Sequence, residues 1–216
     1  MLFRSNSKVI VGDRAAFATT FARLGPSLMG KALDDRVGVA TLIELVKHAP
    51  ANLDLLAAFT VQEEVGLRGA RVAGFTFNPD LAIAIDATPA LDLPSWEESA
   101  GLPLENTQYR TRLDCGPAIY IADAGTLSDP RLVRHLVETA ESLKIPYQFR
   151  QAGGGGTDAG ALHLSREGVP SISVCVPERY AHTAAGLIRL SDWQNTFALL
   201  HTGLSRMTPD ILSTDR

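Results

Sequence analysis

The sequence predicts an α/β protein with three layers, in which helices cover a largely parallel central sheet. Apolar runs typical of buried strands alternate along the chain with segments whose apolar residues recur at helical spacing. The chain has 216 residues, of which 45% are hydrophobic, so it is long enough to bury a sizeable core. Strands that alternate with helices favour parallel pairing, because a helix is the usual crossover between parallel strands.

Four apolar runs are predicted as buried strands: residues 53–61, 81–85, 118–121 and 171–176. Three segments are predicted as helices. The first carries Val39, Leu42, Ile43 and Val46 on one face, and the second follows the helix-start signal Asp129-Pro130. The third begins at Ser191, which forms a capping-box pattern with Gln194. The polar stretch 88–112 is expected to be a long loop or an outer hairpin.

The composition limits the classes of binding partner and the cellular compartment that we expect. Twenty basic and 24 acidic side chains give a net charge of −4, which argues against nucleic acid or an anionic membrane as a partner. No stretch reaches the roughly 18 apolar residues of a membrane span, and we expect no signal peptide from the polar first residues. Cys115 and Cys175 lie in apolar runs and are expected to be reduced thiols. We therefore expect a cytoplasmic protein.

Acidic side chains follow several of the predicted strands. Glu63 and Glu64 come after the first, Asp86 ends the second and His182 follows the fourth, while Asp34 and Asp35 precede a helix. Ligands of such sheets bind at the carboxyl ends of the strands. Carboxylate and imidazole ligands together suit zinc, cobalt or manganese. The same residues alone could instead be caps, turn residues and a surface histidine.

Five motifs resemble, in the same order, those of the M42 family of metallo-aminopeptidases, a group that includes glutamyl aminopeptidases and TET peptidases and has some members labelled endoglucanases. The resemblance runs from about Gly30 to Leu204. The motifs are Gly-Lys-Ala-Leu-Asp-Asp-Arg-Val-Gly (30–38), Thr-Val-Gln-Glu-Glu-Val-Gly-Leu-Arg-Gly-Ala (60–70), Ile-Asp-Ala-Thr (85–88), Gly-Gly-Thr-Asp-Ala-Gly (155–160) and Arg-Tyr-Ala-His-Thr (179–183).

The resemblance implies a role for each residue of the site. Asp34 would bridge two divalent metal ions, zinc or cobalt, and would be followed by a cis peptide bond to Asp35. Glu64 and His182 would bind one ion and Asp86 the other. Glu63 would be the general base that deprotonates the metal-bound water. The glycine-rich turn lies near the substrate cleft in the family, which makes Thr157 and Asp158 weaker candidates for substrate contact.

One family motif is missing. No His-x-Asp sequence occurs before Asp34, and the histidine of that motif completes one metal site in the family. Residues 1–25 are predicted to be the remnant of a β-rich accessory domain and a linker at Gly25-Pro26, and residues 26–216 the metallopeptidase catalytic domain. The chain is thus expected to be shortened at its N-terminus relative to the family. The other histidines are expected to be surface or packing residues: His48, His135, His163 and His201.

The leading hypothesis is a metal-dependent aminopeptidase that hydrolyses N-terminal residues from short peptides. A second is a non-catalytic or incomplete subunit of the same fold, which the missing histidine favours. A third is glycoside hydrolysis, which needs two carboxyl groups about 5–9.5 Å apart across a sugar site. Adjacent Glu63 and Glu64 on extended backbone would point to opposite sides and disfavour it. The family also implies a homo-oligomer, at least a dimer.

Overall fold

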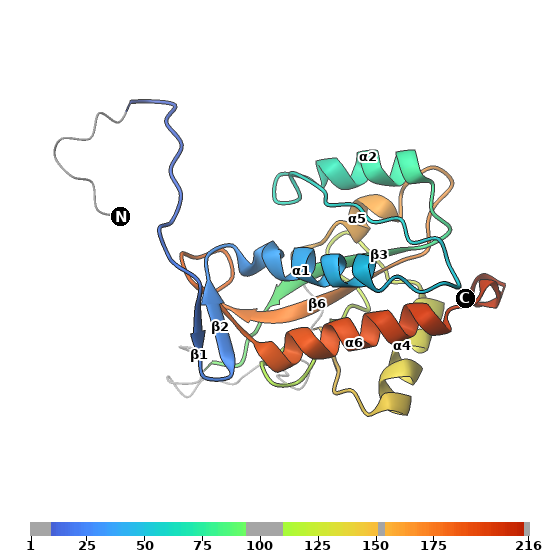
Figure 1. The fold of residues 1–216 in the computed structure, drawn as a ribbon. Helices are drawn as coiled ribbons and strands as arrows, with labels where there is room; N and C mark the ends of the chain where they lie inside the picture. Colours follow the sequence, from blue (N-terminus) through green and yellow to red (C-terminus); the bar gives the residue numbers. More distant parts are fainter. Residues whose placement is uncertain (1–9, 94–109, 151–153, 214–216) are drawn as a thin grey trace, which may run out of the picture.

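The computed structural model describes residues 10–93, 110–150 and 154–213, and the ribbon in Figure 1 shows a sheet with helices packed on it. The strands are β1 (Ala22–Leu24), β2 (Ser27–Gly30), β3 (Ala82–Pro89), β4 (Ala118–Ile119), β5 (Gln148–Phe149), β6 (Ser171–Arg179) and β7 (Gly186–Arg189). The helices are α1 (Leu33–Lys47), α2 (Arg68–Phe77), α4 (Pro130–Leu143), α5 (Ala159–Leu162), α6 (Leu190–Arg206) and the 3₁₀ helix η1 (Pro209–Leu212).

The seven strands of the described residues form one mixed sheet. Its order is β1-β2-β7-β6-β4-β5, and β3 pairs with β6 on the other side of that strand. Only the β3–β6 and β4–β5 pairs are parallel; the other four pairs are antiparallel. The α/β class is therefore confirmed, but the sheet is not largely parallel. Short connections account for two of the antiparallel pairs, β1–β2 and β6–β7, because their turns are too short for a parallel crossover, whereas β2–β7 and β4–β6 join strands that are far apart in the chain.

The side chains of β6 divide the molecule into its layers. Ile172, Val174 and Val176 face α1, α4 and α6, whose leucines complete the main core. On the opposite face, Ser173 contacts Thr157, which lies next to α5, and α2 packs on α5. Figure 1 shows α1 and α6 running next to each other across the sheet, where they are in contact. Helices thus cover both faces, as the three-layer prediction requires.

The three predicted helices are present as α1, α4 and α6. The start of α4 follows its sequence signal: Pro130 is in the first turn, and the side chain of Asp129 accepts a hydrogen bond of 3.0 Å from the amide of Arg131. The capping box predicted at Ser191 is wrong, because α6 already begins at Leu190. The hydroxyl of Ser191 instead donates to Asp114, at 3.4 Å.

Three of the four predicted strands are confirmed as β3, β4 and β6, and β4 is shorter than expected. The strand predicted at 53–61 is wrong: this segment is not part of the sheet, and Leu56, Phe59 and Val61 are at least half exposed. Its apolar sequence suits a strand, but a strand also needs a hydrogen-bonded neighbour. The only strand of the described chain that pairs with β3 is β6, so the edge of β3 toward this segment has no partner.

Gly25 and Pro26 form the turn between β1 and β2, and β1 joins the sheet through β2. Gly25 has φ 60°, a conformation that favours glycine. Residues 10–20 extend away from the body of the molecule (Figure 1). The domain division at residue 25 stays a prediction. Most of the expected loop at 88–112 lies outside the described residues. Among the helices described, none is long and apolar enough to cross a membrane.

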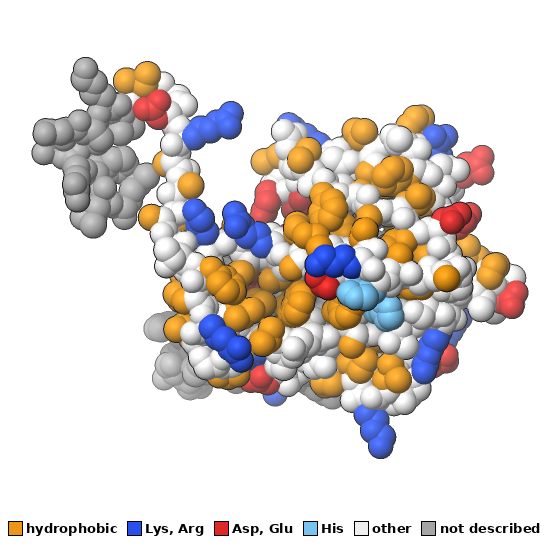
Figure 2. Space-filling view, in the orientation of Figure 1, with side chains coloured by type: hydrophobic (Ala, Val, Ile, Leu, Met, Phe, Trp, Pro, Cys, Tyr) orange, Lys and Arg blue, Asp and Glu red, His pale blue; other side chains and the backbone are white. Residues whose placement is uncertain are grey.

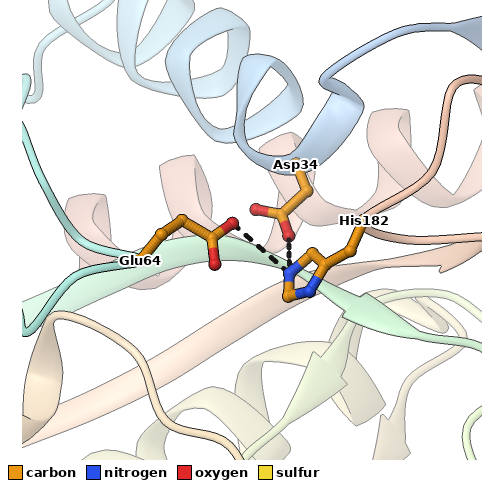
Figure 3. Close-up of side chains that lie close together, drawn as sticks. All are labelled: Asp34, Glu64 and His182. Carbon is orange, nitrogen blue, oxygen red and sulfur yellow. Dashed lines mark ion pairs between the residues drawn. The ribbon is translucent and has the colours of Figure 1, made fainter.

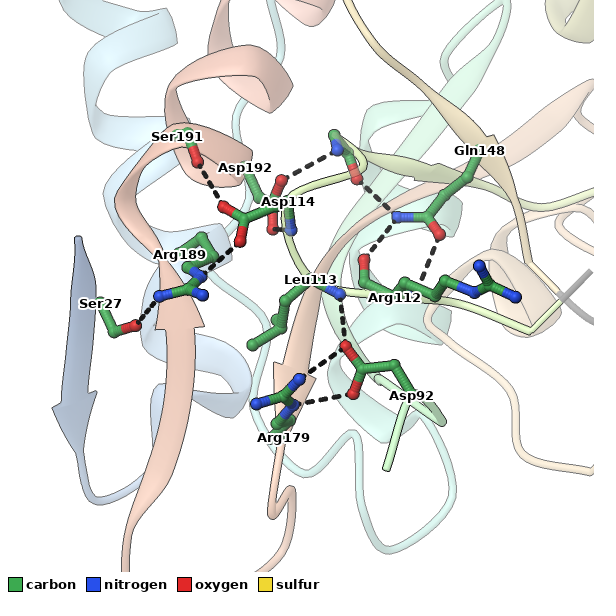
Figure 4. Close-up of polar contacts among 11 residues, drawn as sticks. Ser27, Asp92, Arg112, Leu113, Asp114, Gln148, Arg179, Arg189, Ser191 and Asp192 are labelled. Atoms are coloured by element: carbon green, nitrogen blue, oxygen red, sulfur yellow. Dashed lines mark hydrogen bonds and ion pairs between the residues drawn. The ribbon is translucent and has the colours of Figure 1, made fainter. Parts of the chain in front are cut away.

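A polar network fixes the strand ends that lead to the candidate site (Figure 4). Arg179, the last residue of β6, makes two hydrogen bonds of 2.7 and 3.0 Å to the carboxylate of Asp92. The carboxylate of Asp192 accepts bonds from the amides of Asp114 and Gly116, and Arg189 pairs with Asp114 at 2.7 Å. A paired, two-point arginine contact restricts orientation, so β6 is held just before the turn that carries His182.

Candidate metal centre

Three side chains from distant parts of the chain meet at one point (Figure 3). Asp34 lies in the first turn of α1, Glu64 in the turn before α2, and His182 in the turn between β6 and β7. Nε2 of His182 lies 2.9 Å from Oδ2 of Asp34 and 3.3 Å from Oε1 of Glu64. One ligand atom from each residue lies within 4.8 Å of the other two. This spacing leaves these donors able to surround a single cation.

The turns that carry Asp34, Glu64 and His182 contain residues with a strained backbone conformation. Ala32, Gln62, Tyr180 and His182 all have φ between 51° and 62°, a left-handed conformation that costs free energy in residues other than glycine. Each lies within two residues of a member of the group or belongs to it. Such strain persists only where the surrounding structure fixes it and is concentrated at functional sites. The clustering here marks the three turns as parts of one site.

Glu63 and Asp86 lie beside this group and differ from Glu64 in their surroundings. Burial raises the pKa of Glu63 to about 7, and the negative charges of Asp158 and Glu64 add to the shift. Asp86 is buried within β3, three residues before its end, and its Oδ1 accepts a hydrogen bond of 2.7 Å from the amide of Ala87. Burial, followed by the charge of Asp35, raises the pKa of Asp86 well above its usual range.

Three further carboxyl groups, those of Asp35, Asp158 and Glu178, lie near these residues and complete a cluster of acidic side chains. Burial raises the pKa of Asp35 to about 8, although the amide of Gly38 donates to its Oδ1 at 2.9 Å. A Cβ at Gly38 would lie 2.2 Å from that carboxylate, so glycine is required there. Asp158 accepts a hydrogen bond from Thr60. Glu178 is only 2% exposed, accepts from the amide of Asp34, and has a pKa raised to about 7, chiefly by burial.

The donor set fits a divalent cation. Seven carboxyl groups and one imidazole converge, and no lysine or arginine of the described chain forms an ion pair with any of them. Like charges that are buried together are unfavourable unless a cation compensates for them. Two carboxylates and an imidazole are ligands that zinc and related ions accept. Asp34, Glu64 and His182 could therefore hold one such ion.

The structure thus brings together three of the four predicted metal ligands. Asp86 is close enough to feel the charges of Asp34 and Asp35, yet it is not part of the three-residue group. No histidine of the described residues joins Asp34 and Asp86 to complete a second group. The peptide bond between Asp34 and Asp35 is cis, as the family resemblance implies.

The predicted substrate contacts face different ways. The hydroxyl of Thr157 lies 2.7 Å from that of Ser173 and is buried within the fold. Asp158 lines a cavity of about 1070 Å³ that also reaches Asp34, Glu63 and Asp86. Contact of either residue with a substrate stays a prediction. The other four histidines each place a ring nitrogen within 3.1 Å of a backbone carbonyl, in line with the expected surface or packing roles: His48, His135, His163 and His201.

Sequence reasoning missed Glu178. A signal was present, since Glu178 directly follows the apolar run 174–177, in the way that Asp86 follows the predicted strand 81–85. Its burial could not be predicted, because it depends on Gly186 in the neighbouring strand. A Cβ at that glycine would lie 1.7 Å from Oε1 of Glu178. The glycine therefore makes room for the carboxyl group beneath Asp34.

Fold and site together define an α/β protein with an acidic, cation-attracting centre where β3 and β6 end. The chain belongs to the M42 glutamyl aminopeptidase family, whose sequence model matches residues 5–199. A putative aminopeptidase of Acetivibrio thermocellus is 36% identical over 193 residues, which cover 89% of this chain and 56% of that protein.

Two solved structures extend the comparison. An aminopeptidase from the archaeon Desulfurococcus kamchatkensis superposes with a TM-score of 0.80 at 36% identity, over 91% of this chain and 54% of that one. A TET1 peptidase of Pyrococcus horikoshii gives 0.71 at 30% identity, over 88% and 54%, and is described as assembling into a tetrahedron or a large octahedral shell. The chain therefore spans about half the length of these relatives.

Proposed function

We propose that this chain is the catalytic part of a metal-dependent aminopeptidase that hydrolyses N-terminal residues from short peptides. The observation that carries the proposal is the meeting of Asp34, Glu64 and His182 with ligand atoms within 4.8 Å of one another. Family membership over residues 5–199 supports the reaction class. In this account, Asp34, Glu64 and His182 hold a zinc or cobalt ion. When bound, that ion would act as a Lewis acid toward the peptide carbonyl and the attacking water.

Glu63 has the properties of a general base. In the metal-free chain its pKa is raised to about 7, and the positive charge of a bound ion would lower it, so the carboxylate would be available to accept a proton near neutral pH. It is next to Glu64 in sequence but does not belong to the three-residue group. Glu63 would take the proton from the attacking water and pass it to the nitrogen of the leaving peptide. The reaction therefore needs Glu63 free of direct metal ligation.

The acidic surroundings would also select the substrate. A peptide N-terminus carries a positive charge, which the carboxylates that lie among the mostly apolar residues lining the cavity would attract. Oδ1 of Asp158 is buried, lacks a hydrogen-bond partner within the protein, and belongs to a residue that lines this cavity. Asp158 is thus our candidate for binding the α-amino group, with Thr157 as a support through Ser173.

A second candidate function is a non-catalytic or incomplete subunit of the same fold. The surroundings of Asp86 favour this incomplete subunit, because the described residues supply no histidine that would complete a metal site with Asp34 and Asp86. The family uses two ions, and a chain that holds only one could bind metal without turnover. Both functions share the first ion, so metal binding alone does not separate them.

The experiment that separates them combines metal content with turnover. The protein is loaded with zinc or with cobalt, and release of chromophore is followed on a panel of aminoacyl anilides. We expect metal-dependent release that a chelator abolishes and added ion restores. Bound metal without release on any substrate would favour the incomplete subunit. Release that is insensitive to the chelator would contradict a metal-dependent mechanism.

We also propose that the protein is a homo-oligomer and that it is located in the cytoplasm. The shells described for the Pyrococcus horikoshii relative support a homo-oligomer here, at least a dimer. Figure 2 shows hydrophobic side chains at the surface of the molecule, and Val39, Ile43 and Val46 of α1 are among the exposed large hydrophobic residues. Two cysteines without a disulfide fit a reducing, cytoplasmic location.

A further inference from the structure

Glu178 is a buried carboxyl group to which the proposed reaction gives no role. It is the penultimate residue of β6, and only 2% of it is exposed. Its Oε2 is buried and has no hydrogen-bond partner among the described residues. Gly186 of β7 provides the space, since a Cβ at that position would collide with Oε1 of Glu178. Burying such a group costs free energy, and departures of this kind from an apolar core are expected at functional sites.

The side chain of Glu178 reaches the first turn of α1. Val176 packs against Leu33 of α1, and side chains two residues apart on a strand lie on the same face. The amide of Asp34 donates a hydrogen bond to the carboxyl group of Glu178. This amide is among the first of a helix, which have no acceptor within the helix itself. The residue before α1, Ala32, provides no side-chain cap, so Glu178 supplies an acceptor from a neighbouring strand.

The backbone of Glu178 connects two further segments of the candidate metal centre. In the sheet, Glu178 lies opposite Pro89 of β3 and Ile188 of β7. Its carbonyl accepts a hydrogen bond of 2.8 Å from the first amide after β3. The strand β3 carries Asp86, and the turn from β6 to β7 carries His182. Through its side chain and its backbone, Glu178 therefore contacts α1, β3 and β7 and lies close to three of the segments that form the site.

We propose that Glu178 is a positioning residue of the metal centre, which holds Asp34 in place through its backbone amide. The inference rests on the proposed function, because it concerns the same bound ion. Glu178 is not part of the three-residue group, so it acts through Asp34 rather than on the ion. Asp34 has a non-helical backbone (φ −78°, ψ 109°), so the helix does not fix its orientation. Groups that orient metal ligands in this way are worth about 10–100-fold in metal affinity.

Amide hydrogen exchange in the metal-free chain tests the contact itself, without any enzymatic activity. In the parent protein the amide of Asp34 should exchange at least about tenfold more slowly than in Glu178→Ala. Glu178→Gln keeps an acceptor oxygen and should preserve this protection. The amide of Leu136, in the middle of α4, reports overall stability and serves as the reference in each protein. An Asp34 amide that exchanges as fast in the parent as in Glu178→Ala would overturn the proposal.

Zinc affinity separates this inference from the proposed function. Zinc binding should weaken by about 10–100-fold in Glu178→Ala and by about fivefold or less in Glu178→Gln. Asp129→Ala is the control for stability, because it removes a buried carboxyl group that caps α4, and it should keep its zinc affinity. A parent protein that binds no zinc would refute the proposed function. Equal affinity in the parent and Glu178→Ala would refute only the role of Glu178, and equal weakening in the two Glu178 variants would replace positioning by an effect of charge.

Gly186 offers an independent way to displace the same carboxyl group. Gly186→Ala leaves Glu178 intact but removes the space for its side chain, so it should weaken zinc binding about as much as Glu178→Ala does. In the double variant the two losses should not add, because the added methyl group acts only through a carboxyl group that is already absent. Additive losses would contradict the proposal. If Glu178→Ala does not fold, Gly186→Ala takes its place in the exchange and zinc measurements.

Discussion

Glu63 and Glu64 are neighbours in sequence, yet their surroundings suit different roles, a general base and a metal ligand. Glu64 is exposed and lies 3.3 Å from the ring of His182, where it can share a cation. Glu63 is partly buried, and its pKa is raised to about 7. The motif at residues 60–70 identified both glutamates as candidate site residues. Their separation into ligand and base rests on the family resemblance and agrees with these environments.

Substituting each glutamate by glutamine should therefore have different effects. Glu63→Gln keeps the shape of the side chain but removes the proton acceptor, so turnover should fall by about 10²–10⁴-fold while metal content is unchanged. Glu64→Gln removes a charged ligand, so metal content should fall together with any turnover. Metal analysis and anilide hydrolysis on the same preparations check both. Equal metal loss in the two variants would show that the roles are misassigned.

Among the elements, the three predicted helices are all present, whereas one of the four predicted strands is not. The start of α4 was readable from Asp129-Pro130 because capping is a local interaction. The segment 53–61 has the composition of a buried strand, but whether it pairs depends on what lies beside β3, which local sequence does not contain. The antiparallel pairs arise in the same way, from strand neighbours such as β2 and β7 that are far apart in the chain.

The contact between α2 and the segment before it positions the two glutamates. The amide of Gly69 donates to the carbonyl of Val61 at 2.9 Å, and a Cβ at Gly69 would lie 2.5 Å from the backbone nitrogen of Val61. Gly69→Ala should therefore push this segment away from α2, lower stability by about 1–3 kcal/mol, and weaken metal binding.

Thermal unfolding and metal titration of Gly69→Ala check this prediction. Gly125→Ala is a matched control, because a Cβ there would meet nothing closer than 3.9 Å. That variant should unfold and bind metal like the parent protein. A Gly69→Ala protein with unaltered stability and affinity would mean that the close approach to Val61 does not hold the site in place.

At the scale of the whole molecule, the carboxyl cluster links stability to pH. The folded chain raises the pKa of Glu178 from 4.5 to about 7 and that of Asp35 from 3.8 to about 8. It therefore retains protons that the unfolded chain has already released. Its free energy of unfolding must then fall as pH rises through this window, from about 5 to about 8.

For the metal-free protein we expect the melting temperature to fall by about 5–10 °C between pH 5 and pH 8. The shift at Glu178 alone corresponds to about 3 kcal/mol, and each kcal/mol moves the midpoint of a protein of this size by about 2–4 °C. Added divalent ion should reverse the loss, since it binds the ionised carboxylates. A melting temperature that stays level or rises over this range without metal would contradict the burial of these groups.

The α/β class, the three metal-binding candidates that meet and the positions of α1, α4 and α6 were predicted from sequence, whereas the mixed strand directions and the helix α2 were not. Asp34, Glu64 and His182 were recognisable because each lies in a motif that resembles one of the M42 family; their pattern alone left other roles open. The burial of Glu178 and the unpaired edge of β3 were not, since both depend on contacts between distant segments. These two features are where the structure adds most to the sequence.

The claim at the centre of this account is that Asp34, Glu64 and His182 hold a divalent ion. Its most direct test is the zinc content of the purified protein at equilibrium, compared with that of His182→Gln and of His163→Gln as a matched control. We predict about one tightly held ion per chain in the parent protein and in His163→Gln. Most of that zinc should be lost in His182→Gln. An unmodified chain that holds no zinc, or a His182→Gln protein that holds as much as its parent, would contradict the account.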